Sequence, residues 1–185
     1  MTNYSDRIKE HYIACWSNKP SEHRWHKGPT HQLPTDFCVL EFRPTKQREM
    51  WTYATCSMWQ PKDEILIELH LFSPAQYSLH IELLTVIAHY HRTGSALDLG
   101  PTVSFGRPWM DGSKCTYGLI SLPYLDGPNL EDLVLPDQQV VKCLWLIPIT
   151  KAERDFKKIH GLETFEQEFE KSEFDFLNPK RPSIV

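Results

Sequence analysis

The stretch from Leu83 to Leu125, LLTVIAHYHRTGSALDLGPTVSFGRPWMDGSKCTYGLISLPYL, has the most distinctive pattern in the chain. Its first part is apolar on nearly every side, which is typical of the second half of a buried helix. A loop interrupted by glycine and proline follows, and Cys115 to Leu122 then has the pattern of a strand. We therefore expect a helix, a long surface loop and a strand, in that order, at the centre of the fold.

The helix is expected to begin upstream of this stretch, at Ser73. The Ser73 side chain can cap a helix, Pro74 suits the first helical position, and Gln76 can reach back to the cap amide. The helix should run to about Arg92 and end at Gly94, because glycine adopts left-handed backbone geometry at the least cost. Since its apolar residues are distributed nearly all round, we expect it to lie across a sheet.

Three strands are predicted before this helix, at Phe37–Phe42, Met50–Trp59 and Glu64–Phe72. In the second and third of them the residue type changes with a period of two, as expected for strands. The aromatic residues of the second strand all fall on one predicted face, which indicates core or a helix-facing surface. The links between the three strands are short and polar, which favours an antiparallel meander.

Two further strands are predicted after the helix, at Thr102–Phe105 and Val140–Ile149. The second is apolar on both faces except at Lys142, which is typical of a central strand covered above and below. Between them, Asn129 to Leu133 has the pattern of one helical turn.

Helices are predicted at both ends of the chain. Ser5 to Asn18 carries one apolar stripe, and Thr150 with Glu153 forms the pattern of a capping box. A helix should therefore run from Thr150 to His160, and a last helix should follow with Leu162, Phe165 and Phe169 as its apolar stripe. Together these elements predict one α+β domain over residues 1–185. It has a mixed, largely antiparallel sheet flanked by helices, a core at about residues 37–161, and an acidic C-terminal helix and tail.

Composition excludes several classes of protein. The 185 residues carry a formal net charge of −4 with no basic block, which argues against nucleic acid binding. No apolar run is long enough to span a bilayer, and no signal-peptide core follows the polar start, MTNYSDRIKE. The five cysteines are odd in number and widely spread, so we expect reduced thiols, no disulfide framework and a cytoplasmic location.

Neither a metal site nor a catalytic site is predicted. His23, His26 and His31 lie around Trp25, but no paired motif supplies the further ligands that zinc needs. Cys115 could pair with a histidine as a nucleophile, although its place in an alternating strand favours a structural thiol. The glycines of the central loop form no phosphate-binding motif, and no known hydrolase motif is present. We therefore predict no catalytic residues, no metal and no cofactor.

Two surfaces are candidates for binding a partner. The first is the loop from Gly100 to Lys114, because long glycine-rich loops lie on the surface and tryptophan and arginine are enriched among interface anchors. The alternative for this loop is that its tryptophan packs on the sheet and its arginine pairs with its aspartate. The candidate residues are Arg107, Trp109, Asp111 and Lys114.

The second candidate surface is the acidic last helix. Between Glu163 and Asp175 six acidic residues stand against one lysine, and the candidates among them are Glu163, Glu166 and Glu170. Such a run is commonly a solvated face. It also suits contact with a basic partner.

Several stretches between about Phe37 and Gly161 resemble the bacterial Suppressor-of-fused domain family: MWTYATCSM, ELHLFSP, LLTVIAHYHRTG, TVSFGRPW, SKCTYGLISLPYLDG and WLIPITKAERDF. The resemblance implies a mixed sheet flanked by helices. It also implies an immunity protein of a polymorphic toxin system, which binds and neutralises a cognate toxin. The animal relatives hold a transcription-factor segment as an added strand between two domains, and this chain has the equivalent of the first domain only. The resemblance supplies no catalytic residues.

Three functions thus remain open from the sequence. The leading hypothesis is a non-enzymatic immunity protein that binds a cognate toxin, with neither nucleic acid nor membrane as a partner. The alternatives are a peptide-binding regulatory scaffold like the animal relatives and a cysteine-dependent hydrolase.

Overall fold

The computed structural model describes residues 4–28 and 30–185; residues 1–3 and 29, which belong to the predicted domain, lie outside the described residues. The elements are, in order, α1 (Tyr4–Trp16), β1 (Ser21–His23), β2 (Cys38–Phe42), β3 (Trp51–Cys56), β4 (Ile67–Ser73), α2 (Leu79–Thr93), β5 (Thr102–Ser104), β6 (Cys115–Ser121), α3 (Pro128–Glu131), β7 (Asp132–Val134), β8 (Val140–Thr150), α4 (Lys151–His160) and α5 (Leu162–Lys171). This confirms the α+β class predicted from the sequence.

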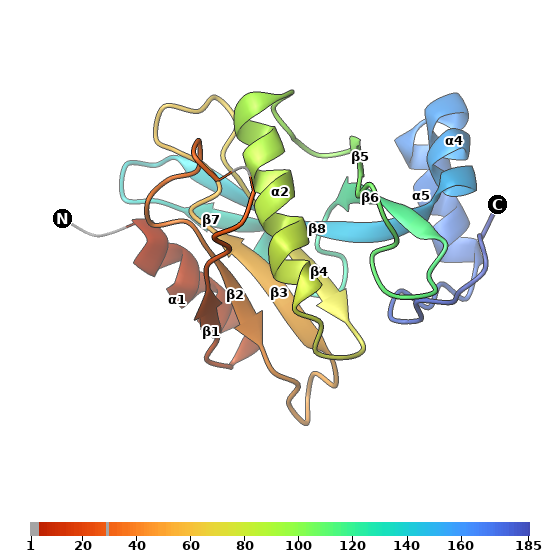
Figure 1. Cartoon of the computed structure of the whole chain (residues 1–185), viewed down its shortest axis with the longest axis horizontal. Coiled ribbons are helices and arrows are strands. Elements are labelled where there is room, and N and C mark those ends of the chain that lie inside the picture. Colours follow the sequence, from red (N-terminus) through yellow and green to blue (C-terminus); the bar gives the residue numbers. More distant parts are fainter. Residues whose placement is uncertain (1–3, 29) are drawn as a thin grey trace.

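The strands form one sheet in the order β1-β2-β3-β4-β8-β6-β5, with β7 also paired to β8. Strand β4 runs parallel to β8, and the other strand pairs of the described residues are antiparallel. Strand β8 is the longest and joins the two halves of the sheet (Figure 1). Its first half pairs with β4 and β7, and its second half pairs with β6. The predicted central strand and the β2-β3-β4 meander are therefore confirmed.

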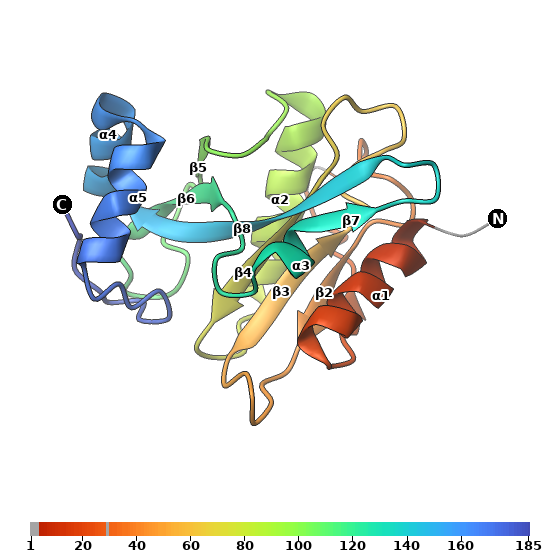
Figure 2. The ribbon, with the colours of Figure 1, turned by 180° about the vertical axis from the view of Figure 1, so that it is seen from behind.

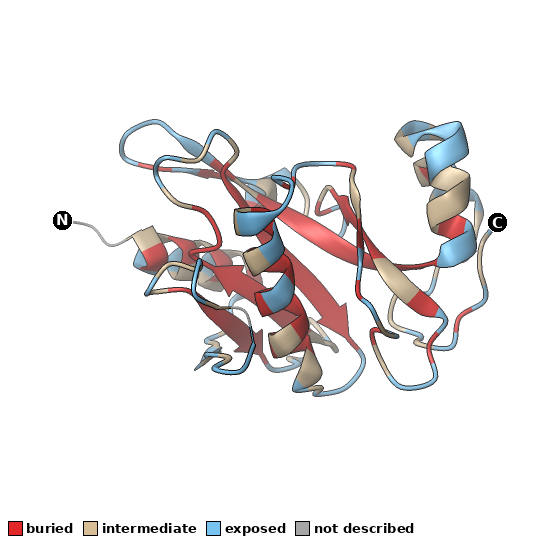
Figure 3. Cartoon of the chain, turned by 45° about the horizontal axis from the view of Figure 1, so that its top comes forward, coloured by how far each residue is buried: buried red, intermediate tan, exposed pale blue. Residues whose placement is uncertain are grey.

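Helices cover both faces of the sheet: α2 lies on one face, and α1, α3 and α5 lie on the other. Helix α2 lies across the face seen in Figure 1, over a core that includes Leu69 and Leu144. Helices α1 and α3 lie on the opposite face, and α5 packs on that same face at the far end of β8 (Figure 2). The sheet itself is buried almost throughout, whereas α4 is largely exposed (Figure 3).

The predicted start of α2 at Ser73 is wrong. Ser73 is the last residue of β4, where it pairs with Trp51, and its hydroxyl donates to the carbonyl of Ala75. The helix begins at Leu79, so the Ser-Pro-Ala-Gln pattern marks a turn. The helix is also less enclosed than predicted, because Val86 and Tyr90 are exposed.

The aromatic residues of the predicted strand Met50–Trp59 do not all share one face. Strand β3 ends at Cys56, and Ser57 after it has a positive φ of 68°. Trp51 and Tyr53 of β3 pack against the core under α2, whereas Trp59, beyond the end of β3, packs with α1 on the opposite face. The strands β1 and β7 were not predicted; each has three residues, and pairing with β2 and with β8 decides their structure. The predicted helical turn at 129–133 is α3, displaced by one or two residues.

The core under α1 contains a fully buried carboxyl group, Glu68. It accepts hydrogen bonds from the Thr55 hydroxyl at 2.5 Å and the Met58 amide at 3.0 Å, and burial raises its pKa from 4.5 to about 8. The folded state thus binds more protons than the unfolded state between these values. The stability that Glu68 provides is complete below about pH 4.5 and is lost as the pH rises towards 8.

Two buried histidines act in the opposite direction. Burial lowers the pKa of His70 and of His80 to about 3, so the stability they provide is complete above pH 6.5 and is lost as the pH falls. Glu68→Gln keeps a hydrogen-bond acceptor and leaves both histidines in place. The unfolding free energy of the variant, compared with that of the unchanged chain at the same pH, should therefore increase by about 2 kcal/mol as the pH rises from 5.5 to 7. Urea titrations of both proteins at the two pH values measure this difference, and a pH-independent difference would contradict a protonated Glu68.

Candidate functional site

A groove of about 630 Å³ lies between α5, the segment that follows α5, and the turn after β6. Its base is formed by Trp145 and Ile147 of β8, because odd-numbered residues of this strand point to the α5 side of the sheet. Tyr124 and Leu125, both about half exposed, form part of its edge. The remaining lining residues are Glu163, Glu166, Gln167, Phe169, Glu170, Ser172, Phe174 and Phe176. We call this feature the acidic groove.

The rim of the acidic groove on α5 carries Glu163, Glu166 and Glu170. They lie three and four residues apart, which places them on one side of the helix. In the described part of the chain, no lysine or arginine forms an ion pair with any of the three. Glu168, on another side of the helix, does pair with Lys171. The acidic candidates from the sequence therefore lie together, and no cation of the described residues pairs with their charges.

Polar contacts hold the middle of this rim in place. The Ser121 hydroxyl donates to the Glu166 carboxylate at 2.9 Å. Partial burial, together with the negative charge of Glu166, raises the pKa of the Tyr124 hydroxyl, which therefore stays neutral near neutral pH. The groove thus presents negative charge next to a neutral phenol.

The interior of the groove is aromatic. Trp145 lies 5.2 Å from Phe72 and 5.2 Å from Phe176 between ring centres, and Phe169 lies 4.3 Å from Phe174. Trp145 is 5% exposed, and its indole N–H meets no acceptor among the described residues. An apolar surface beside uncompensated carboxylates suits a ligand that carries both an apolar and a cationic side chain.

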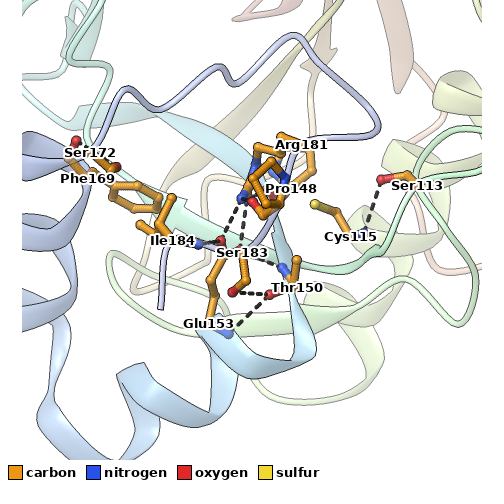
Figure 4. Close-up of polar contacts among 11 residues, drawn as sticks. Ser113, Cys115, Pro148, Thr150, Glu153, Phe169, Ser172, Arg181, Ser183 and Ile184 are labelled. Carbon is orange, nitrogen blue, oxygen red and sulfur yellow. Dashed lines mark hydrogen bonds and ion pairs between the residues drawn. The ribbon is translucent and has the colours of Figure 1, made fainter.

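One wall of the groove depends on the C-terminal tail, which a buried ion pair fastens to the body (Figure 4). Arg181 donates to both oxygens of Glu153, at 2.6 and 2.8 Å, and to the carbonyl of Pro148 at 2.9 Å. Glu153 also accepts from the amides of Thr150 and Ile184. The sequence identified Thr150 and Glu153 as a capping box, but it gave no sign that this carboxylate also binds the tail.

The binding candidates in the loop from Gly100 to Lys114 lie in different surroundings from one another. Trp109 is 3% exposed and stacks on His80 at 5.5 Å, which places it in the core as its packing alternative expected. Arg107 pairs with Glu82 at 2.9 Å, and Asp111 accepts from the Tyr77 hydroxyl, so the alternative pair between Arg107 and Asp111 does not form. Lys114 is exposed. The loop therefore offers separate charged groups, and its tryptophan adds almost no surface.

The histidines near Trp25 and the Cys115 thiol were the other candidates for chemistry from the sequence. His23 lies 3.6 Å from Glu41, and His31 lies beside His89. Within residues 4–28 and 30–185, no three potential ligands are close enough to hold a metal ion. Cys115 is 1% exposed, and burial raises the pKa of its thiol, which favours the unreactive protonated form.

No helix within residues 4–28 and 30–185 is both long and apolar enough to cross a membrane.

Comparisons with known proteins identify relatives of the whole chain. The family model described as Suppressor of fused protein (SUFU) matches residues 34–182. The crystal structure of a putative SUFU homolog from Neisseria gonorrhoeae is 32% identical, with a TM-score of 0.86, and the match covers 98% of this chain and 97% of that chain. No curated protein sequence matches.

Two more distant structures share the fold. A chain of the Sufu–Fu complex is 14% identical with a TM-score of 0.70, covering 98% of this chain and 92% of that one. Drosophila Suppressor of fused is 15% identical with a TM-score of 0.67, covering 96% of this chain. The present chain spans 50% of the Drosophila chain.

Proposed function

The chain belongs to the Suppressor of fused (SUFU) protein family, and from this we propose that it is a non-enzymatic, protein-binding domain. The observation that carries the proposal is the acidic groove, where Glu163, Glu166 and Glu170 border an aromatic interior and form no ion pair with a lysine or arginine of the described residues. The fold is shared with a chain from a complex of Sufu with Fu, which supports protein binding as the general role.

The partner we propose is a cognate toxin, and the chain is then an immunity protein. The resemblance to bacterial Suppressor-of-fused domains supports this role, and so does the similarity to a bacterial homolog over nearly the full length of both chains. An immunity protein needs only to cover a functional surface of its toxin, which requires no catalytic residues. The odd number of cysteines favours a reducing compartment, so we propose that this binding takes place in the cytoplasm.

Co-expression tests the immunity role. The chain should restore growth of bacteria that express the variable C-terminal domain of a toxin encoded next to it, and the two purified proteins should form a complex. A complex without rescue of growth would contradict immunity but leave protein binding in place. Rescue without a complex would contradict the binding mechanism.

The proposed surface makes a prediction about charge. The triple substitution Glu163→Gln, Glu166→Gln, Glu170→Gln should weaken toxin binding about tenfold and flatten its dependence on salt. The reason is that exposed ion pairs contribute up to about 1 kcal/mol each and are screened by salt. Isothermal titration calorimetry at two salt concentrations measures both effects.

A matched control removes the same charge elsewhere. Glu10, Glu64 and Asp98 are exposed residues on α1, on the link before β4 and on the loop after α2. Replacing them by Gln, Gln and Asn should leave affinity and its salt dependence unchanged. Equal losses in the two triple variants would show that only net charge matters, and would contradict the acidic groove as the binding surface.

A regulatory scaffold that binds a peptide is the second candidate function. The observation that favours it is the position of β5, which ends the strand order and has a free outer edge in the described residues. A free edge can accept an added strand. This alternative places the partner beside residues 102–114, away from the acidic groove.

A further inference from the structure

Two cysteines face each other across neighbouring strands. Cys38 of β2 is the direct antiparallel partner of Cys56 of β3, so both side chains lie on the same face of the sheet, under α1. Both are 0% exposed. Residues opposite one another in antiparallel strands have Cα atoms about 4.5 or 5.5 Å apart, and disulfides span about 4.4–6.8 Å. The backbone therefore already has the spacing of a disulfide.

The other three cysteines have no such partner. Cys143 is aligned with Glu68 on β4, Cys115 is aligned with Thr150 on β8, and Cys15 lies on α1. Among the described residues, Cys38 and Cys56 are thus the pair of cysteines that the sheet register places opposite each other.

The surroundings make the two thiols chemically different. The neighbouring Cys56 thiol lowers the pKa of Cys38, and the positive charges of Lys9 and Arg24 act in the same direction, against burial and Glu22. The proximity of Cys38, together with burial, raises the pKa of Cys56. Cys38 is therefore the thiol that ionises first and the nucleophile of the pair.

Cys38 contacts an ion pair that is partly exposed. Its Sγ lies 4.0 Å from the Glu22 carboxylate, and Glu22 pairs with Lys9 at 2.8 Å. Lys9 and Glu22 are both partly exposed, and exposed pairs of this kind contribute about 1 kcal/mol or less. We expect that opening of this pair, between α1 and the short strand β1, exposes the Cys38 thiol to an oxidant.

We propose that Cys38 and Cys56 form an oxidisable dithiol site, which closes to a disulfide between β2 and β3 when a low-molecular-weight disulfide such as oxidised glutathione is supplied. The Cys38 thiolate attacks one sulfur of glutathione disulfide, and one glutathione thiolate leaves. Cys56 then loses its proton and attacks the Cys38 sulfur, and the second glutathione thiolate leaves. The protein loses two electrons and two protons, and one glutathione disulfide becomes two glutathione thiols.

The site adds a redox response to a protein whose thiols are otherwise reduced. The bond would join two adjacent strands without moving the backbone far, so the fold should survive oxidation. Cys56 Sγ also lies 3.4 Å from the carbonyl of Ser5, near the start of α1. Because the new bond turns this sulfur towards Cys38, oxidation should loosen α1 at its first turn.

Thiol counting on the full chain tests the proposal. The native protein is incubated with oxidised glutathione, alkylated under denaturing conditions and analysed by non-reducing peptide mapping. We expect a Cys38–Cys56 link, a mass loss of two hydrogen atoms and three of the five thiols still free. The Cys56→Ser variant should instead retain one glutathione on Cys38, and Cys115→Ser should form the same link as the unchanged chain.

Two results would overturn the proposal. One is the recovery of five free thiols at glutathione disulfide concentrations that modify an exposed cysteine in a control peptide. The other is a link that uses Cys15, Cys115 or Cys143. Circular dichroism of the oxidised protein is recorded in parallel, because a link that forms only with loss of the fold also contradicts a preformed site.

Discussion

Replacing Arg181 by methionine is expected to destabilise the fold by about 3–5 kcal/mol, because it leaves the Glu153 carboxylate buried without its cation. Glu153 is 0% exposed, and Arg181 supplies two of its hydrogen bonds and one to Pro148. Methionine fills part of the volume of the arginine side chain. The loss of unfolding free energy therefore reflects the missing charge and hydrogen bonds more than the formation of a cavity. Denaturation in urea measures the change.

A second substitution separates the effect of the unpaired Glu153 charge from the other contributions to the loss of unfolding free energy. Glu153→Gln in the Arg181→Met background removes the charge and keeps an acceptor for the Thr150 amide, so it should recover about 1–2 kcal/mol. Lys180→Met, on the exposed neighbouring residue, should change the unfolding free energy by about 0.5 kcal/mol or less. A loss for Arg181→Met no larger than that for Lys180→Met would show that the tail is not fastened by this pair.

Arg181→Met should also weaken toxin binding. Phe174 and Phe176 form one wall of the acidic groove, and they lie between α5 and Arg181 in the chain. The Arg181 guanidinium also lies 4.6 Å from the ring centre of Phe174. Release of the tail should therefore weaken toxin binding even at temperatures where the domain stays folded.

Trp109→Ala is expected to cost about 3–5 kcal/mol, the range for removal of a large buried aromatic side chain. Trp109 is 3% exposed and stacks on His80, which is itself fully buried and stays neutral because burial lowers its pKa to about 3. The substitution leaves a cavity and admits water to the imidazole. Chemical denaturation at pH 7 measures the loss.

Tyr124→Ala is the matched control for Trp109→Ala. Tyr124 is 57% exposed at the edge of the acidic groove, so its removal should leave the unfolding free energy within about 0.5 kcal/mol while weakening toxin binding. The two aromatic residues should thus show opposite effects on stability and binding. A Trp109→Ala variant with unchanged stability and weakened toxin binding would show that Trp109 belongs to the partner-binding surface.

The features that could be predicted from the sequence depend on neighbours in the chain. The apolar run of β8 marked it as central, and Thr150 and Glu153 marked the start of α4, which has the expected reciprocal hydrogen bonds. Ser73 shows the limit of such patterns. It fits a helix cap locally, but its pairing with Trp51 across the sheet decides its structure.

The candidate site depends on contacts between distant segments, which no local pattern shows. The three glutamates of α5 were found from their spacing and charge. That they border a groove follows from the contact of α5 with β8 and with the turn after β6, which are separate segments of the chain. Arg181 in an irregular tail carried no sign that it would be buried. The sequence left open whether Trp109 is an interface anchor or packs in the core, and its contact with His80 of α2 places it in the core.

Hydrogen exchange of the complex with the toxin tests the central claim most directly, because it locates the partner without any substitution. The account predicts slower amide exchange in the complex at residues 163–176 and at Tyr124 and Leu125, with little change at residues 100–114. Slower exchange confined to residues 100–114, with residues 163–176 unchanged, would contradict the acidic groove as the binding surface.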